Sequence, residues 1–186
     1  YFHILFYIVR EDKFSKQFFD ILKTKAKEGV EVRLLVDRVG SYQVKKPTIK
    51  ELRDAGVQFA FSNRLRLPFL FYSSQVRNHR KISIIDGKIG YLGGFNVGKE
   101  YIDQDPKLSP WRDYHLKITG ESVPYLQREF FIDWNEYASD HVVVDSRYAP
   151  EQPKGTVPHQ LVPTEAGRLE DKYFHLIQNA KKSITI

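Results

Sequence analysis

Short apolar runs alternate with longer amphipathic stretches along the first third of the chain. Residues 1–9 (YFHILFYIV), 30–37 (VEVRLLVD) and 57–61 (VQFAF) are rich in aromatic and β-branched side chains, as buried strands are. Between them, residues 15–29 (SKQFFDILKTKAKEG) and 47–55 fit helices, each ended by a glycine. Strands that alternate with helices need crossover connections, so this part of the chain predicts a mainly parallel sheet.

The pattern changes after the third predicted strand. Residues 79–85 (HRKISII) and 88–94 (KIGYLGG) are strand-like, and the Asp-Gly dipeptide between them favours a tight hairpin. Residues 114–120 (YHLKITG) predict another strand, and residues 122–138 (SVPYLQREFFIDWNEYA) predict a helix with a proline in its first turn. The fold class that follows is α/β, with a mixed, mostly parallel β-sheet flanked by helices.

Both ends of the chain point to a longer polypeptide. Residues 149–163 contain four prolines and predict a linker. Residues 171–186 (DKYFHLIQNAKKSITI) predict a helix running into a strand, so that KSITI takes the place that YFHILFYI has at the start. Because the chain also has no methionine, we interpret it as a piece of a duplicated protein, cut after its first half.

The charge balance narrows the class of partner. The 186 residues suffice for one sizeable domain, and 29 Lys and Arg exceed 23 Asp and Glu, which gives a net charge of +6. This excess favours an anionic partner such as a phosphate ester, a nucleic acid or an acidic membrane surface. The absence of cysteine excludes disulfides and thiolate metal sites, and no apolar run approaches the ~20 residues of a membrane-spanning helix.

The predicted hairpin carries a group of polar residues suited to phosphate. His79, Lys81 and Asp86 have the spacing H-x-K-x-x-x-x-D. Side chains alternate along a strand, so His79 and Lys81 should face one side while Arg80 faces the other. Two basic groups on one face make a poor core and a good phosphate site, in which Lys81 would act as a point charge.

The sequence G-x-N completes this pattern after the second strand of the hairpin. Gly93 and Gly94 would let backbone approach closely, and Asn96 could donate its amide to the same phosphoryl oxygens. His79 is the candidate nucleophile, because there is no cysteine and no G-x-S-x-G sequence, and it would form a phosphohistidine. Asp86, beside the turn, is expected to brace the motif rather than touch substrate.

Each of these features alone has an ordinary structural explanation. H-x-K on a strand usually has no catalytic role, Asp-Gly is usually only a turn, and G-G-x-N only a loop. Their combination at these intervals is far more specific than any one of them. Metal binding is the weaker alternative, since neither H-x-H nor H-E-x-x-H occurs.

The combined motif resembles the phospholipase D superfamily. The stretches RNHRKISIIDGKIGYLGGFNVGKEYI, WRDYHLKITGESV and REFFIDW are similar to the first half of bacterial cardiolipin synthases, and the similarity covers nearly the whole chain. Members of this family carry two such motifs, one per half, which meet at a pseudo-twofold axis. The resemblance assigns catalytic roles to His79, Lys81, Asp86 and Asn96, and places on Asp113 the acidic residue that orients a histidine across that axis.

The resemblance also implies a reaction and a division of the chain. Two phosphatidylglycerol molecules would give cardiolipin and glycerol through a phosphohistidine, without metal or organic cofactor. Residues 1–148 would be the first catalytic half, residues 149–163 the Pro-rich linker and residues 164–186 the start of a truncated second half. Only one H-x-K-x-x-x-x-D occurs here, so the general acid is missing and the fragment alone should be nearly inactive.

The expected partners follow from the same resemblance. They are an anionic phospholipid (phosphatidylglycerol), a membrane surface and the missing second half of the same polypeptide, with no nucleic acid. The full-length protein would act at the bacterial cell membrane, while this fragment would be soluble.

Several further residues have two possible roles, one functional and one structural. Residues 63–72 (NRLRLPFLFY) could dip into lipid or form an ordinary buried loop. Glu100, with Tyr101 and Trp111, could line a substrate pocket, although core packing explains the tryptophan equally well. His115 is better explained as a structural histidine. Arg77 is more suited than Arg80 to reach phosphate, and both could simply be solvated.

Two other functions stay open. One is a single-motif phosphodiesterase or nuclease that completes its site as a homodimer. The linker and the restarting repeat count against it, because such an enzyme would end after its first unit. The other is a non-catalytic phosphate- or lipid-binding module, and the complete set of His79, Lys81 and Asn96 counts against that. A second motif downstream of Ile186 would distinguish the cardiolipin synthase interpretation from the nuclease.

Overall fold

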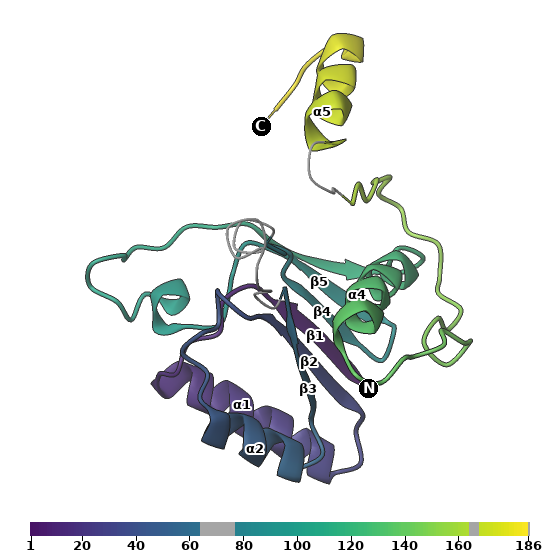
Figure 1. The fold of residues 1–186 in the computed structure, drawn as a ribbon. Helices are drawn as coiled ribbons and strands as arrows, with labels where there is room; N and C mark the ends of the chain where they lie inside the picture. Colours follow the sequence, from purple (N-terminus) through teal and green to yellow (C-terminus); the bar gives the residue numbers. More distant parts are fainter. Residues whose placement is uncertain (64–76, 164–167, 186) are drawn as a thin grey trace, which may run out of the picture. The chain divides into compact units, whose positions relative to one another are not determined.

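Six strands form one open sheet in the order β3–β2–β1–β4–β5–β6 (Figure 1). The computed structural model describes residues 1–63, 77–163 and 168–185. The strands are β1 (Phe2–Phe6), β2 (Val32–Asp37), β3 (Gln58–Ser62), β4 (Ile82–Ile85), β5 (Ile89–Gly93) and β6 (His115–Thr119). The helices are α1 (Lys13–Lys27), α2 (Lys46–Asp54), the short 3₁₀ helix η1 (Lys99–Ile102), α4 (Val123–Tyr137) and α5 (Arg168–Asn179).

The sheet is mixed, as the sequence predicts, but parallel pairing does not dominate it. β1–β2 and β2–β3 are parallel, where α1 and α2 supply the crossovers. β1–β4, β4–β5 and β5–β6 are antiparallel. The expectation of a mostly parallel sheet is therefore wrong in this respect. The hairpin of β4 and β5 is antiparallel as predicted. The antiparallel majority arises because β4 also pairs with the distant β1 in the antiparallel direction, and β6 pairs with β5 in the same way.

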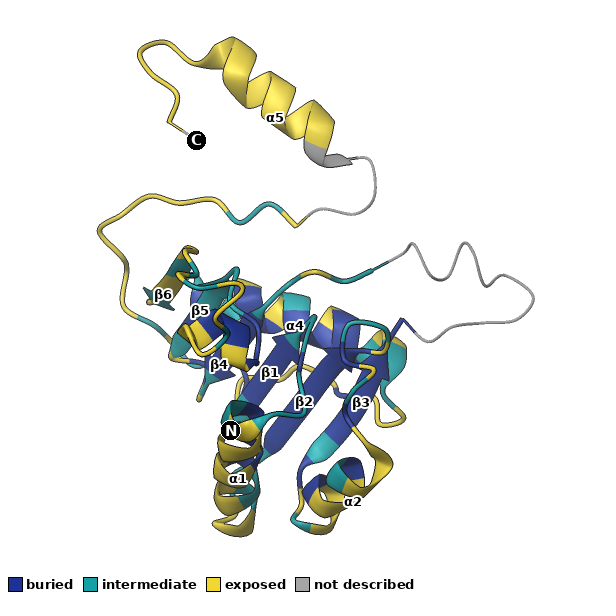
Figure 2. Ribbon diagram, turned by 90° about the vertical axis from the view of Figure 1, so that its left-hand side faces the viewer, coloured by how far each residue is buried: buried dark blue, intermediate teal, exposed yellow. Residues whose placement is uncertain are grey.

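Helices cover both faces of the sheet (Figure 1). On one face, Ile4, Leu34 and Phe59 from the three neighbouring strands join Leu22 of α1 and Leu52 of α2 in a single apolar cluster. All five are buried, and burying one such side chain contributes about 1.5–3 kcal/mol. The outward faces of α1 and α2 are exposed, while β1, β2 and β3 are mostly buried (Figure 2). The other face is covered by α4.

The start of α1 is tied to a distant loop. The side chain of Asp12 accepts a hydrogen bond from the backbone N–H of Ser15 at 2.8 Å and thereby caps the helix. Its second oxygen accepts from the backbone N–H of Lys99 at 2.8 Å. This one carboxylate therefore fixes η1, and the residues just before it, against the start of α1.

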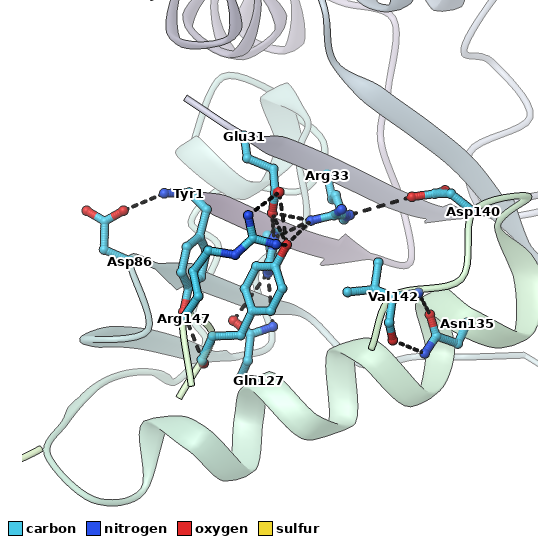
Figure 3. Close-up of polar contacts among 11 residues, drawn as sticks. Tyr1, Glu31, Arg33, Asp86, Gln127, Asn135, Asp140, Val142 and Arg147 are labelled. Atoms are coloured by element: carbon cyan, nitrogen blue, oxygen red, sulfur yellow. Dashed lines mark hydrogen bonds and ion pairs between the residues drawn. The ribbon is translucent and has the colours of Figure 1, made fainter. Parts of the chain in front are cut away.

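A buried polar cluster lies between α4 and the sheet (Figure 3). The fully buried His3 of β1 places Nδ1 2.9 Å from the Gln127 amide nitrogen and Nε2 3.0 Å from a Glu31 oxygen. Arg33 donates to Glu31, and the hydroxyl of Tyr148 donates to the same carboxylate at 2.9 Å. A neutral imidazole that accepts at Nδ1 and donates from Nε2 satisfies this arrangement.

The pKa values of His3 and Glu31 in this cluster are shifted from their ordinary values. Burial lowers the pKa of His3 below its ordinary value of 6.5 and outweighs the hydrogen bond to Glu31, which raises it. Burial raises the pKa of Glu31, but the hydrogen bond with His3 and the charge of Arg33 outweigh it and bring the value to about 2. Because Tyr148 belongs to the same cluster, the chain that follows α4 is held against the sheet up to that residue.

The chain divides into two units, residues 1–156 and residues 157–186. In the second unit α5 confirms the predicted helix, and Tyr173, Phe174, Leu176 and Ile177 are exposed on it. The strand expected after it is not formed in residues 181–185, because a strand needs a partner for its hydrogen bonds. Among the helices that the structure describes, none is long and apolar enough to cross a membrane. The division into half, linker and second half stays a prediction.

The pKa of His3 predicts a loss of stability in mild acid. The unfolded chain binds a proton at His3 below about pH 6.5, whereas the folded chain resists it, so the free energy of unfolding should fall as the pH decreases from 6.5. A further loss follows between pH 4.5 and about 2, as Glu31 becomes protonated. His3→Gln should flatten the first of these slopes, while the second should persist in reduced form, because Arg33 and Tyr148 still lower the pKa of Glu31. Denaturant unfolding at a series of pH values measures both, and an unchanged first slope in the variant would contradict the assignment.

Candidate active site

The candidate motif begins in a segment just before β4 that belongs to no helix or strand. The predicted strand at residues 79–85 starts three residues later, at Ile82, so His79 and Lys81 lie outside the sheet ladder. Both neighbouring strands end one residue past the partners of Ile82, at Phe6 in β1 and at Gly93 in β5, so His79 lies beyond the end of the sheet. Residues 77–81 therefore have to be positioned by side chains.

One side of this segment is anchored on α4. The buried carboxylate of Asp133 accepts two hydrogen bonds from Arg80, at 2.9 and 3.1 Å, and one from the side-chain amide of Asn78 at 2.7 Å. Burial raises the pKa of Asp133, and the charge of Arg80 opposes that rise. Arg80 is therefore an anchor rather than a solvated side chain. Asp133 was missed, although a carboxylate on the apolar face of a predicted helix signals a buried ion pair.

The other side of the segment lies on Tyr7, the residue that follows β1. The rings of Tyr7 and His79 are stacked, with centroids 3.9 Å apart and planes at 20°. The Lys81 ammonium lies 5.6 Å from the centre of the same Tyr7 ring, within cation–π range, and donates to the His79 carbonyl at 2.5 Å. The predicted alternation is thus found: His79 and Lys81 share one side, opposite Asn78 and Arg80.

The surroundings keep the His79 imidazole neutral. Partial burial and the charge of Lys81 lower its pKa, Arg77 lowers it further, and Asp37 opposes the shift. The pKa of Lys81 is also lowered by burial, and the negative charge of Asp113 opposes this. A neutral imidazole has a free lone pair, so these shifts favour nucleophilic attack by His79 near neutral pH.

The two glycines allow another part of the chain to come close. A Cβ at Gly94 would lie 2.0 Å from an oxygen of Asp113, and one at Gly93 would lie 2.4 Å from the Tyr114 carbonyl and 2.6 Å from Cα of His115. The backbone N–H of Gly94 also donates to the Tyr114 carbonyl at 3.0 Å. The glycines therefore bring Asp113 to the site. A contact of these two glycines with substrate stays a prediction.

Asn96 is held by the chain itself. Its side-chain oxygen accepts from the backbone N–H of Ile8 at 2.9 Å, and its amide nitrogen donates to the Tyr101 hydroxyl at 3.0 Å. The ring of Tyr101 packs edge-on against Trp111, with centroids 4.7 Å apart. Asn96 thus fixes the residue next to Tyr7. The hydrogen bonds of the described residues engage one of its two amide hydrogens, and the use of the other for phosphate stays a prediction.

Three other predicted residues are engaged in ion pairs or turns. Arg77 pairs with the buried Asp37 at 3.4 Å, next to His79. Glu100 is buried and accepts from Arg10 at 2.7 Å. Asp86, with a left-handed φ of 53°, lies beyond the four residues of β4, roughly 13 Å from the start of that strand. Asp86 is thus far from His79, and its role as a brace of the motif stays a prediction.

The last candidates do not add ligands to the site. His115 is half-buried against Phe95, with ring centroids 5.5 Å apart, and burial lowers its pKa. The loop considered for lipid contact, residues 63–72, lies outside the described residues apart from Asn63. Within residues 1–63, 77–163 and 168–185, no group of three His, Asp or Glu side chains is placed to hold a metal ion.

Comparison with known proteins gives a consistent picture. Residues 1–108 match the family described as cardiolipin synthase, phospholipase D-like domain. Over 99% of its length the chain is 40% identical to the minor cardiolipin synthase ClsB of Bacillus subtilis, of which it covers 46%. It is 41% identical to the major cardiolipin synthase ClsA of the same organism and covers 39% of it. The chain thus spans less than half the length of these relatives.

Solved structures share the fold at low sequence identity. NucT from Helicobacter pylori superposes with a TM-score of 0.54 at 17% identity, covering 74% of this chain and 80% of that one. Phosphatidylserine synthase from Haemophilus influenzae gives 0.53 at 17% identity, covering 82% of this chain and 34% of that one. These likenesses support the mixed sheet flanked by helices.

The glycine pair predicts two different outcomes for one small substitution. Gly93→Ala places a methyl group against backbone atoms of Tyr114 and His115, which cannot move independently, and should cost about 1–3 kcal/mol of stability. The three atoms nearest to a Cβ at Gly94 all belong to the exposed Asp113 side chain, which can rotate away, so the loss from Gly94→Ala should be smaller. Denaturant midpoints measure the difference. Equal losses from the two variants would contradict the contact assignment.

Proposed function

The chain belongs to the cardiolipin synthase family with a phospholipase D-like domain, and from this membership we propose that it supplies half of a phosphatidyltransferase active site. In this proposal the whole protein condenses two phosphatidylglycerol molecules to cardiolipin and glycerol. The observation that carries the proposal is the placement of His79 and Lys81 together on Tyr7, with the pKa of His79 lowered.

The proposed reaction divides one displacement into two steps. An imidazole nitrogen of His79 forms a bond to phosphorus while the bond to the glycerol oxygen breaks, and the glycerol leaves with a proton from a second acid. A hydroxyl of the second phosphatidylglycerol then loses its proton to that same group and attacks phosphorus. The N–P bond breaks, cardiolipin is released and His79 returns to its starting form.

The remaining residues have supporting roles in this proposal. Lys81 holds the phosphoryl oxygens, Arg77 adds positive charge beside them, and the second amide hydrogen of Asn96 donates to them. Gly93 and Gly94 let the chain approach closely, and Glu100 holds the η1 region through Arg10.

The second acid would come from outside the residues of this chain. We infer that residues 149–163 are a linker and that residues 164–186 begin a second half with its own histidine. Asp113, exposed beside Gly94, would orient that histidine. Because the substrates are phospholipids, the full-length protein would work at the surface of the bacterial cell membrane.

The first test concerns the nucleophile. His79→Asn in the full-length protein should abolish both turnover and the covalent phosphatidyl adduct. Asp113→Ala should instead act like loss of the second histidine, slowing product formation while His79 still forms the adduct. Acid quenching with mass spectrometry of the peptide that contains residue 79 measures the adduct. Finding the phosphatidyl group on a different histidine would reverse the assignment.

A second test separates a phosphate site from general basicity. Lys81→Ala should weaken binding of inorganic phosphate to the full-length protein about tenfold or more, because a charged hydrogen-bond donor is lost. Lys88 is exposed in the turn between β4 and β5, so Lys88→Ala is the matched control and should have no effect. Isothermal titration measures both. Equal weakening by the two variants would mean that overall positive charge, not a built site, binds phosphate.

A further inference from the structure

Tyr7 is the one described side chain shown in contact with the rings or charges of both His79 and Lys81. Its ring is nearly parallel to the imidazole at 3.9 Å and lies 5.6 Å from the ammonium. The segment that carries the motif precedes β4, so ladder hydrogen bonds do not fix the His79 side chain. The orientation of the imidazole therefore depends on the surface against which it lies.

The position of Tyr7 is itself fixed from two sides. The buried hydroxyl of Ser41 donates to the Tyr7 carbonyl at 3.1 Å. A Cβ at Gly40 would lie 2.3 Å from the same carbonyl oxygen and 3.0 Å from the ring, so only glycine leaves room for Tyr7 there. On the other side, the backbone N–H of Ile8 donates to Asn96. Loops that follow β2 and β5 thus hold one aromatic ring in place.

We propose that Tyr7 is a positioning residue for the transfer reaction. Its ring sets the plane of the His79 imidazole and keeps the Lys81 ammonium beside it, so that the imidazole and the ammonium contact the same phosphoryl group. This inference rests on the proposed function, because it assigns His79 as the nucleophile. It also gives Ser41 and Gly40 an indirect role, because they hold Tyr7, and it adds to the proposed phosphate contact of Asn96 a second role, because Asn96 holds Ile8 beside Tyr7.

The stack has an electrostatic consequence that can be measured. The charged groups facing His79 are Lys81 and Arg77, which lower its pKa, and Asp37, which raises it. The Tyr7 ring removes water from one face of the imidazole, and burial is the largest cause of the lowered pKa. Without the ring, the pKa of His79 should rise, and the acid limb of the activity profile should move to higher pH.

The experiment compares four variants of the full-length protein, with phosphatidylglycerol vesicles as substrate. Tyr7→Ala and Tyr7→Leu remove the aromatic ring, and the second keeps much of its volume. Tyr7→Phe keeps the stack and loses only the hydroxyl. Tyr125→Ala removes a tyrosine that is 60% exposed on α4 and serves as the control. The readouts are kcat, KM, the pH profile of kcat/KM and the histidine NMR signal of residue 79.

Tyr7→Ala and Tyr7→Leu should lower kcat about tenfold or more, since small misplacement of a reacting group is costly. KM should change less, and the acid limb and the NMR titration of His79 should both move to higher pH. Tyr7→Phe and Tyr125→Ala should stay within about twofold of the parent, because the stacked face is intact in both.

Three outcomes would overturn the inference. Tyr7→Leu could retain the parent rate and acid limb, Tyr7→Phe could be as defective as Tyr7→Ala, or kcat could fall without any shift in the titration of His79. Because Tyr7→Leu preserves much of the packing, it still tests the role of the aromatic ring if Tyr7→Ala does not fold. Failure of the proposed function looks different: His79→Asn would then remain active, whatever the substitutions at Tyr7 do.

Discussion

The buried carboxylate of Asp133 is the constraint on which the site depends. A carboxylate removed from water must be paired, and leaving one partner of such a pair alone costs about 3–5 kcal/mol. Arg80 and Asn78 supply the partners, so both must turn toward α4. His79, which lies between them, and Lys81, which follows Arg80, lie on the other side of the segment, against Tyr7. A structural ion pair on one side thereby directs His79 and Lys81 to the other.

Only part of this arrangement could be predicted from the sequence. The shared side of His79 and Lys81 follows from a period of two residues, and the hairpin follows from one dipeptide, so both are local properties. The stack on Tyr7 joins residues separated by 72 positions, and the pairing of Asp133 joins residues more than 50 positions apart. The hydrogen bond from Ile8 to Asn96 is also long-range. No local pattern encodes such contacts. The antiparallel majority of the sheet was missed for the same reason, because the pairing of β4 with β1 is a long-range choice.

One polar cluster lies at each end of β1. His3, near its start, lies in a closed network in which the imidazole and the carboxylate of Glu31 already have partners. Tyr7, just past its end, contacts a histidine that is exposed on one side. Both histidines have a lowered pKa, with burial as the largest cause. The lowered pKa alone therefore does not distinguish a structural histidine from a reactive one, whereas exposure to solvent does separate His79 from the buried His3.

The charges at the site suit a phosphodiester in a particular way. The phosphoryl group carries one negative charge in the substrate and in a histidine adduct, and about two in the five-coordinate stage between them. An ammonium fixed beside it gains most where that charge is largest, which lowers the barrier more than it strengthens binding. The ammonium of Lys81 is held by the Tyr7 ring and the His79 carbonyl, so it need not reorganise as the charge develops. The same contacts that orient the nucleophile thus also preorganise the cation.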